Sequence, residues 1–262
     1  VKRRTETLKT TIAEKEKIES ELAVARDIQL QLVPSDFPAT PKRKEFDIYA
    51  SLKPAREVGG DFYDFFFIDR NSLCLVIGDV SGKGVPAALF MALSQTILRS
   101  TTLNGRDLAV ALRQANELIL HDNRADLFLT AFYARLNTRS GGLRYVNAGH
   151  NPPLWLHSAS GELGSLPGHG TVLGAFDETW LEEYEIQMAA GDCLVLYTDG
   201  VTEAMDADRE QFDDERLRSV VVANAAASAQ GVLEAIVEAV RDFRGENPPS
   251  DDLTLCVVRR VP

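Results

Sequence analysis

Apolar, strand-like runs fill most of the chain after residue 45, and they come in groups rather than in alternation with helices. Such runs, rich in β-branched and aromatic residues and bounded by Gly, Asp and Pro, predict strands. The predicted strands are 46–52, 61–68, 72–80, 130–137, 143–149, 152–157, 182–188, 192–200 and 253–260, and the predicted helices after the first are 85–102, 106–121, 214–224 and 229–243. Because strict strand–helix alternation is missing, the pattern predicts an α+β fold, with antiparallel sheet and helices on its faces.

The first 33 residues predict a separate helix, because they contain neither Gly nor Pro and are rich in Ala, Glu, Lys and Leu. Pro34, Pro38 and Pro41 end it. We therefore divide the chain into a helical linker, 1–35, and a compact domain, 36–262. The heptad seam of the helix is interrupted by polar residues, so two interpretations stay open. The helix pairs with a second copy as a coiled coil, giving a homodimer, or it lies on its own domain; both hold if one half pairs and the other docks.

Composition excludes several classes of function. The net charge of −11 argues against nucleic-acid binding and against docking on anionic lipid. No stretch approaches the length of a membrane span, and the polar start VKRRTETLKTT is not a signal peptide. The start also lacks an initiator methionine, which suggests a piece of a longer protein. Cys74, Cys193 and Cys256 lie in apolar runs, which predicts free buried thiols in a reducing, cytoplasmic compartment.

Acidic residues stand at the ends of the apolar runs. The four places are Asp61, Asp79, Asp199 and the pair Asp251 and Asp252. Carboxylates that converge at a sheet edge repel one another, and a hard divalent cation relieves that repulsion. Ligands that are all oxygen favour magnesium, manganese or calcium over zinc. Two ions that share a carboxylate can activate a water for attack on a phosphate ester.

A turn or cap aspartate is the simpler explanation for any one of these residues. It explains the set less well, because turn residues have no reason to follow apolar strands so regularly. The segment GDVSGKG at 78–84 is not a nucleotide-binding P-loop, because it has three residues where that motif needs four and Gly84 where it needs Ser or Thr. It predicts instead an aspartate at a strand end, a glycine turn and a helix with Pro86 in its first turn.

Five motifs in order carry a resemblance to a known family: REVGGDFYDFF, GDVSGKGVPAALFMA, NAGHNPPL, YTDGVTEA and PSDDLTL. They resemble the SpoIIE/RsbU-type serine phosphatases of the metal-dependent PPM (type-2C) superfamily, over residues 45–260. The preceding ARDIQLQLVPSDFP resembles the regulatory helix that leads into this family's catalytic domain. The resemblance implies a sandwich of two antiparallel sheets with helices outside, and two manganese or magnesium ions at one end of it.

The resemblance also implies roles for individual residues. Asp79 resembles the carboxylate that bridges the ions, and the backbone carbonyl of Val80 resembles the neighbouring ligand. Asp199 and Asp251 resemble ligands of one ion, and Asp61 resembles the acid of the first motif. Of these, Asp61 and Asp79 are the expected catalytic acids. Arg56, five residues before Asp61, has the spacing of the superfamily's phosphate-gripping arginine, and an ordinary surface arginine is the alternative.

The chain departs from the wider superfamily in two places. Ser81 and Lys83 follow the bridging acid where many relatives place a histidine, so the donor of the leaving-group proton stays open. His150 stands where relatives carry an aspartate for a third ion, and we interpret it as a hydrogen-bonding turn residue. Glu203, Asp252 and His150 are secondary candidates for the site. Asp64 is expected to face solvent, and the alternative is an acid that supports the metal ligands from behind.

The function implied is metal-dependent hydrolysis of phosphoserine or phosphothreonine on a protein. The family implies a small STAS-type antagonist (anti-anti-sigma) protein as substrate in a bacterial partner-switching pathway, and an upstream sensor domain that can be membrane-bound. Two alternatives are a catalytically silent module that binds a phosphoprotein and a two-metal hydrolase of small phosphate esters. The intact set of aspartates argues against the first, and a preference for phosphoprotein over nucleotides would exclude the second.

Overall fold

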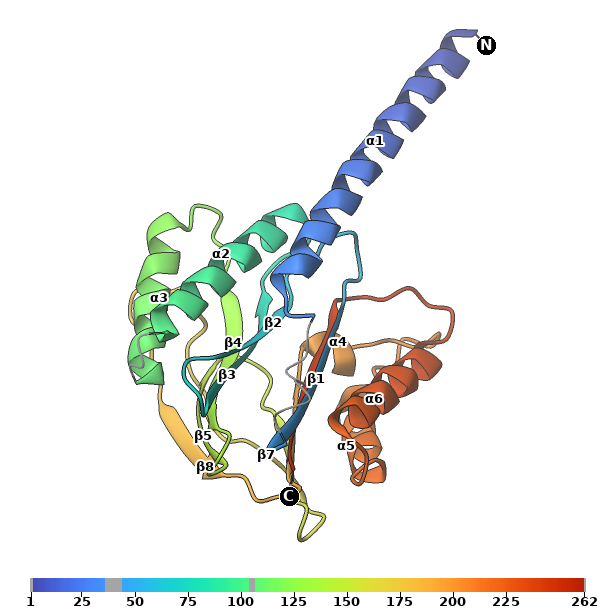
Figure 1. The fold of residues 1–262 in the computed structure, drawn as a ribbon. Helices are drawn as coiled ribbons and strands as arrows, with labels where there is room; N and C mark the ends of the chain where they lie inside the picture. The colour runs from blue at the N-terminus through green and yellow to red at the C-terminus, as the bar shows by residue number, and fades with distance from the viewer. Residues whose placement is uncertain (1, 36–43, 104–106, 262) are drawn as a thin grey trace.

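Two five-stranded antiparallel sheets form the centre of the molecule (Figure 1). The computed structural model describes residues 2–35, 44–103 and 107–261. One sheet has the strand order β1 (Phe46–Lys53), β10 (Leu253–Arg260), β9 (Cys193–Tyr197), β6 (Leu154–Leu156) and β7 (Leu163–Ser165). The other has the order β2 (Phe62–Phe67), β3 (Ser72–Val80), β4 (Leu129–Asn137), β5 (Gly142–Ala148) and β8 (Glu183–Gln187).

Helices cover the outer face of each sheet. Helices α2 (Val85–Thr102) and α3 (Leu108–Asp122) pack on the β2–β8 sheet, while α5 (Asp213–Ala223) and α6 (Ala229–Arg244) pack on the other. Local signals fix where several of them begin. Pro86 lies in the first turn of α2, and the side chains of Asp107 and Ser228 cap α3 and α6 by accepting hydrogen bonds from Ala109 N–H and Gly231 N–H. The predicted α+β class, with two packed antiparallel sheets and outer helices, is confirmed.

The alternation along each strand divides the apolar residues between two layers of core. In β1, Phe46, Ile48 and Ala50 face the other sheet and are buried, whereas Tyr49 packs toward the layer beneath α5 and α6. The aromatics of DFYDFFF behave in the same way: Phe62 is fully buried between the sheets and anchors β2. The three cysteines are free and buried, as predicted.

The sequence placed most elements within a residue or two, with two differences. Strand β7 was not predicted, because three residues with a central Gly164 carry little strand signal. The run 192–200 was predicted as one strand, but β9 ends at Tyr197 and a short helix, α4 (Asp199–Thr202), begins at the acid. Asp199 therefore lies at a helix start that directly follows a buried strand.

Helix α1 (Lys2–Leu32) projects from the domain and touches it only near its C-terminal end (Figure 1). Residues 11–20 are all exposed, whereas Gln29 and Val33 are buried against the domain. The expectation that the end of the helix docks is thus confirmed, and pairing of the remainder with a second copy stays a prediction. Among the described helices, none combines the length and the apolar character needed to cross a lipid bilayer.

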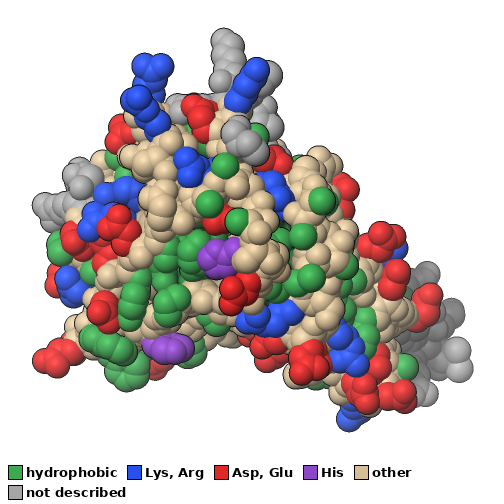
Figure 2. Space-filling model, turned by 90° about the horizontal axis from the view of Figure 1, so that it is seen from below, with side chains coloured by type: hydrophobic (Ala, Val, Ile, Leu, Met, Phe, Trp, Pro, Cys, Tyr) green, Lys and Arg blue, Asp and Glu red, His purple; other side chains and the backbone are tan. Residues whose placement is uncertain are grey.

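Charge is mixed over the end of the molecule seen in Figure 2. Among the side chains coloured there, Lys and Arg are interspersed with Asp and Glu rather than gathered into one basic patch. That face therefore lacks the electrostatic footprint expected of a nucleic-acid surface.

The expectation that Asp64 faces solvent is wrong. Its side chain is fully buried in β2 and pairs with Arg99 of α2, whose Nη1 lies 3.2 Å from Oδ2. Arg99 also lies over the ring of Phe66, 4.5 Å from its centroid. Burial raises the pKa of Asp64, and the Arg99 guanidinium opposes that rise. The pair therefore pins α2 to the sheet.

Removing Arg99 should leave a buried carboxylate without its cation. We expect Arg99→Leu to lower the free energy of unfolding by about 1–3 kcal/mol at neutral pH. Without the guanidinium the folded-state pKa of Asp64 rises further, so the loss should shrink as pH falls and Asp64 takes up a proton. Urea unfolding at several pH values measures this. Arg99→Lys keeps the charge and should lose less; equal losses in both variants, independent of pH, would contradict the assignment.

Candidate active site

The loop before β2 is held in place by one buried acid, Asp252. Its Oδ1 accepts a hydrogen bond from the N–H of Ala55 at 2.8 Å, and its Oδ2 accepts one from the N–H of Gly60 at 2.9 Å. A Cβ on Gly59 would lie 1.8 Å from Asp252 Oδ2, so only glycine allows this approach. Asp252, a secondary candidate from the sequence, thus anchors the loop that presents Asp61.

Asp61 directly precedes β2, between the two sheets, and is buried. Its Oδ2 accepts hydrogen bonds from the hydroxyls of Thr198, at 2.7 Å, and Thr254, at 2.6 Å. Burial, with the charges of Asp79 and Asp252, raises the pKa of Asp61 well above its usual range, and the two threonine hydroxyls partly oppose the rise. A carboxylate in this setting is stabilised by a nearby positive charge.

Asp79 is the penultimate residue of β3 and faces the same space. Burial, then the charges of Asp199 and Asp251, raise its pKa to about 7. The carbonyl of the next residue, Val80, lies close to Gly60. A Cβ added to Gly60 would lie 2.8 Å from Val80 O and 3.5 Å from Asp79 Oδ1. The second glycine of the GG pair therefore leaves room beside both predicted ligand groups.

Asp199 and Asp251 come from the other sheet. Burial and the charge of Asp251 raise the pKa of Asp199, while the ammonium of Lys83 lowers it. Asp251 is already engaged: Lys83 Nζ lies 2.6 Å from its Oδ2 and also donates to the carbonyl of Ser250 at 3.0 Å. Partial burial of its carboxyl group, and then the charges of Asp199 and Asp251, raise the pKa of Glu203.

The other predicted residues are divided between the cleft and its support. Arg56 is exposed and lines the same cleft as Asp79, Lys83 and Asp251. The hydroxyl of Ser81 accepts a hydrogen bond from the N–H of Phe128 at 2.9 Å, which ties the turn after β3 to the start of β4.

His150 is not among the residues that line the cleft. It is buried, its Nδ1 lies 2.9 Å from the hydroxyl of Thr130, and Asn147 bonds to its backbone N–H and carbonyl. Burial lowers its pKa to about 4, so the imidazole is neutral near pH 7. These contacts agree with the interpretation of His150 as a hydrogen-bonding turn residue.

The predicted ligand groups are of the chemical type that binds hard divalent cations. They are carboxylate and carbonyl oxygens, and crowding disfavours their charge. In the described part of the chain, however, no three Asp, Glu, His or Cys side chains converge closely enough to hold a metal ion as they stand. The contacts explain this: Asp61 is turned to two threonines and Asp251 to Lys83. The residues fit the ions in chemistry, and their side chains must turn to bind them.

Three supporting residues were not found from the sequence. Thr198 and Thr254 directly flank acidic motifs, in YTDG and DDLT, and that adjacency was the available signal. Gln29 of α1 gave none. Its side-chain Nε2 donates to the carbonyl of Gly59 at 2.6 Å, and its Oε1 accepts from the N–H of Gly59 at 3.1 Å.

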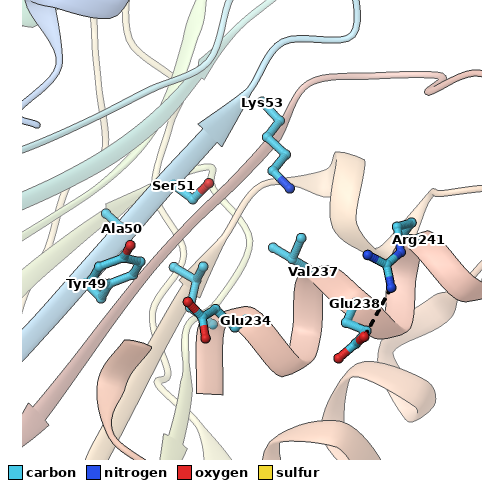
Figure 3. Close-up of a pocket in the computed structure, with 9 residues that line it drawn as sticks. Tyr49, Ala50, Ser51, Lys53, Glu234, Val237, Glu238 and Arg241 are labelled. Carbon is cyan, nitrogen blue, oxygen red and sulfur yellow. Dashed lines mark hydrogen bonds and ion pairs between the residues drawn. The ribbon is translucent and has the colours of Figure 1, made fainter. Parts of the chain in front are cut away.

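A cavity of 360 Å³ between β1 and α6 lies apart from the aspartates (Figure 3). Tyr49, Ser51 and Lys53 line it from the strand, and Glu238 and Arg241 line it from the helix. Arg241 is already paired with Glu238 at 3.1 Å. The lining is mixed in charge and none of the acids above belongs to it, so the candidate site is the acidic cleft.

The family is shown by comparison with known proteins. Residues 69–261 match the family described as Stage II sporulation protein E (SpoIIE). The chain belongs to the SpoIIE family. This membership agrees with the resemblance of its motifs to the PPM phosphatases. The matched region includes Asp79, Asp199 and Asp251, whereas Asp61 and Arg56 precede it.

Individual relatives agree with this membership. Phosphoserine phosphatase RsbU of Bacillus subtilis is 29% identical over 94% of this chain and 71% of its own length. Protein IcfG of Synechocystis is 31% identical over 92% of this chain, which spans only 41% of IcfG. The SiaA-PP2C domain of Pseudomonas aeruginosa has the same fold, with a TM-score of 0.84, 23% identity, and 95% of this chain and 99% of that one covered.

The crowding of acids predicts a pH-dependent stability in the metal-free SpoIIE-family domain. The folded-state pKa of Asp79, about 7, lies above the ordinary value of 3.8, so the folded protein holds this proton more tightly than the unfolded chain. Stability should therefore fall as pH rises from about 4 to 7. Asp79→Asn should flatten that fall and make the EDTA-treated protein more stable at pH 8 by about 1–3 kcal/mol.

Urea unfolding of the EDTA-treated protein from pH 4 to 8 measures this effect. Asp208→Asn removes one exposed negative charge that does not line the cleft and serves as the control, with an unchanged pH profile. An Asp79→Asn profile that parallels the wild type would show that Asp79 does not hold a proton in the folded state.

Proposed function

We propose that this chain hydrolyses phosphoserine or phosphothreonine monoesters on a protein, with two divalent cations, Mn²⁺ or Mg²⁺, as cofactors. The observation that carries the proposal is that Asp61, Asp79, Asp199 and Asp251, which come from both sheets, are close enough for their charges to act on one another, around a cleft that Asp79 and Asp251 line, in a chain of the SpoIIE family. The raised pKa values of three of these acids support it, because a cation would relieve the repulsion that raises them.

Each residue of the cleft has a role in this proposal. Asp79 would bridge the two ions with the Val80 carbonyl beside it, Asp199 and Asp251 would hold one ion, and Asp61 would hold the other. Bound ions of this kind supply positive charge for the phosphate and lower the pKa of water. Arg56, exposed at the mouth of the cleft, is placed to bind phosphate oxygens with its planar guanidinium.

The support around these acids sets their orientation. Thr198 and Thr254 both donate to one oxygen of Asp61, which fixes the orientation of its carboxylate. Asp252 fixes the loop from Ala55 to Gly60 through backbone hydrogen bonds, so Arg56 and Asp61 keep their spacing. Such preorganisation means that little has to be ordered when a phosphate ester arrives.

Membership of the family supports a proposal for the substrate and the partners. RsbU is named a phosphoserine phosphatase, and this supports a phosphoserine protein as substrate here. We propose a phosphorylated STAS-type antagonist protein of a partner-switching pathway. We also propose that 1–35 links a cytoplasmic catalytic domain, 36–262, to an upstream sensor, and that the exposed part of α1 pairs with a second copy. The three free buried thiols fit the reducing compartment.

Turnover of p-nitrophenyl phosphate tests the reaction. We expect activity with Mn²⁺, none with EDTA, and a loss of at least about a hundredfold in Asp79→Ala. Asp208→Asn should retain full activity. A wild type that binds Mn²⁺ without turnover of p-nitrophenyl phosphate or of a phosphoserine protein would favour a silent binding module, and a preference for nucleotides would favour a small-ester hydrolase.

Gln29 should link the linker helix to turnover. Its two hydrogen bonds to Gly59 hold the loop that ends at Asp61, so Gln29→Ala should lower kcat roughly tenfold while leaving the affinity for Mn²⁺ nearly unchanged. Deleting 1–33 should likewise change turnover more than metal affinity. Gln31→Ala, on an exposed position of the same helix, is the matched control. Wild-type kcat and oligomeric state in both the variant and the deletion would exclude a regulatory role.

A further inference from the structure

Lys83 lies over the acidic cleft, on the turn between β3 and α2. The turn is short, with glycines at positive φ on both sides of the lysine, +88° at Gly82 and +77° at Gly84. Ser81, the first residue of the turn, makes two hydrogen bonds with the backbone of Phe128. The backbone around Lys83 is therefore held in place. The side chain of Lys83 extends from it, so that its ammonium group reaches the loop before β10.

The ammonium of Lys83 binds where a metal ligand is expected. Its Nζ lies 2.6 Å from Asp251 Oδ2 and 3.0 Å from Ser250 O. The other oxygen of Asp251, Oδ1, accepts the backbone N–H of Asp252 at 3.0 Å. Both carboxylate oxygens of Asp251 are thus engaged, and a divalent cation approaching Oδ2 would meet a positive charge.

Lys83 also faces the other acids on this side of the cleft. Its charge lowers the pKa of Asp199 and of Glu203, against the burial and repulsion that raise them. One ammonium therefore partly neutralises a group of acids that burial and repulsion otherwise disfavour.

We propose that Lys83 is an internal counter-ion of the metal site, which holds Asp251 in the metal-free protein and must release it before a divalent cation binds there. The inference rests on the proposed function, since it concerns the same site. The exposure of the pair favours release: the side chain of Lys83 is 44% exposed and that of Asp251 is 37% exposed, so the ammonium can return to water on its flexible stem. An exposed pair of this kind is weak enough to be displaced by a doubly charged ion.

The consequence is that Lys83 lowers metal affinity. Removing its charge should remove the competitor and strengthen the attraction between the acids and the ion. We expect Lys83→Met and Lys83→Gln to bind Mn²⁺ about three- to tenfold more tightly than the wild type. Addition of Mn²⁺ should also raise the melting temperature of these variants by more than it raises that of the wild type.

Isothermal titration of Mn²⁺ into the EDTA-stripped full chain, at fixed ionic strength, tests the inference without any assay of activity. Lys83→Arg keeps the charge and should bind Mn²⁺ much as the wild type does. Lys53→Met removes an exposed lysine of β1 and controls for the change in net charge; its affinity should also be unchanged.

The outcomes separate the two proposals. Tighter binding in both Lys83→Met and Lys83→Gln supports the counter-ion. A wild type that binds Mn²⁺, with variants that bind it equally or more weakly, overturns the counter-ion and leaves the proposed function intact; weaker binding would mean that Lys83 holds Asp251 in its ligand position. A wild type that binds no Mn²⁺ overturns both.

Discussion

Acids from the two sheets repel one another across the candidate active site. Asp79 belongs to a strand of one sheet and Asp61 directly precedes another strand of that sheet, while Asp199 and Asp251 flank strands of the other. Asp79 raises the pKa of Asp61, and Asp199 and Asp251 raise the pKa of Asp79, so the folded domain holds together groups that would separate in water. The apolar layers between and outside the sheets supply the stability that keeps them there.

Two adjacent acids near the cleft make different contacts. Asp251 and Asp252 are consecutive, yet one is half-exposed beside Lys83 and the other is buried under the loop from Ala55 to Gly60. Consecutive residues entering a strand point to opposite sides, so one acid faces the cleft and the next faces the protein. Replacing Asp251 would therefore remove a charge from the cleft. Replacing Asp252 would release the loop that carries Arg56 and Asp61.

The sequence predicted what depends on local pattern. Strand periodicity located all strands except the three-residue β7, and acids beside glycines located the cleft. It failed where a contact joins distant segments. Asp64 was expected in solvent because nothing near it in sequence shows Arg99, which lies 35 residues away across a helix–sheet contact. Thr198 and Thr254, donors to Asp61 across a separation of 137 and 193 residues, were missed for the same reason.

The C-terminal end of α1 is also joined to the catalytic domain by contacts between distant segments. Three residues near its end bond to the domain: Gln29 to Gly59, Leu32 to Gln95 of α2, and Pro34 to Tyr63 of β2. Gly59 belongs to the loop that Asp252 anchors, so the helix end and the cleft hold the same short segment from opposite sides. A hydrogen bond of this kind contributes about 0.5–1.5 kcal/mol. Together the set is comparable to the 1–3 kcal/mol typical of coupling between distant sites. A change in the angle of α1 that breaks these bonds is therefore large enough, in energy, to alter how firmly Asp61 is held.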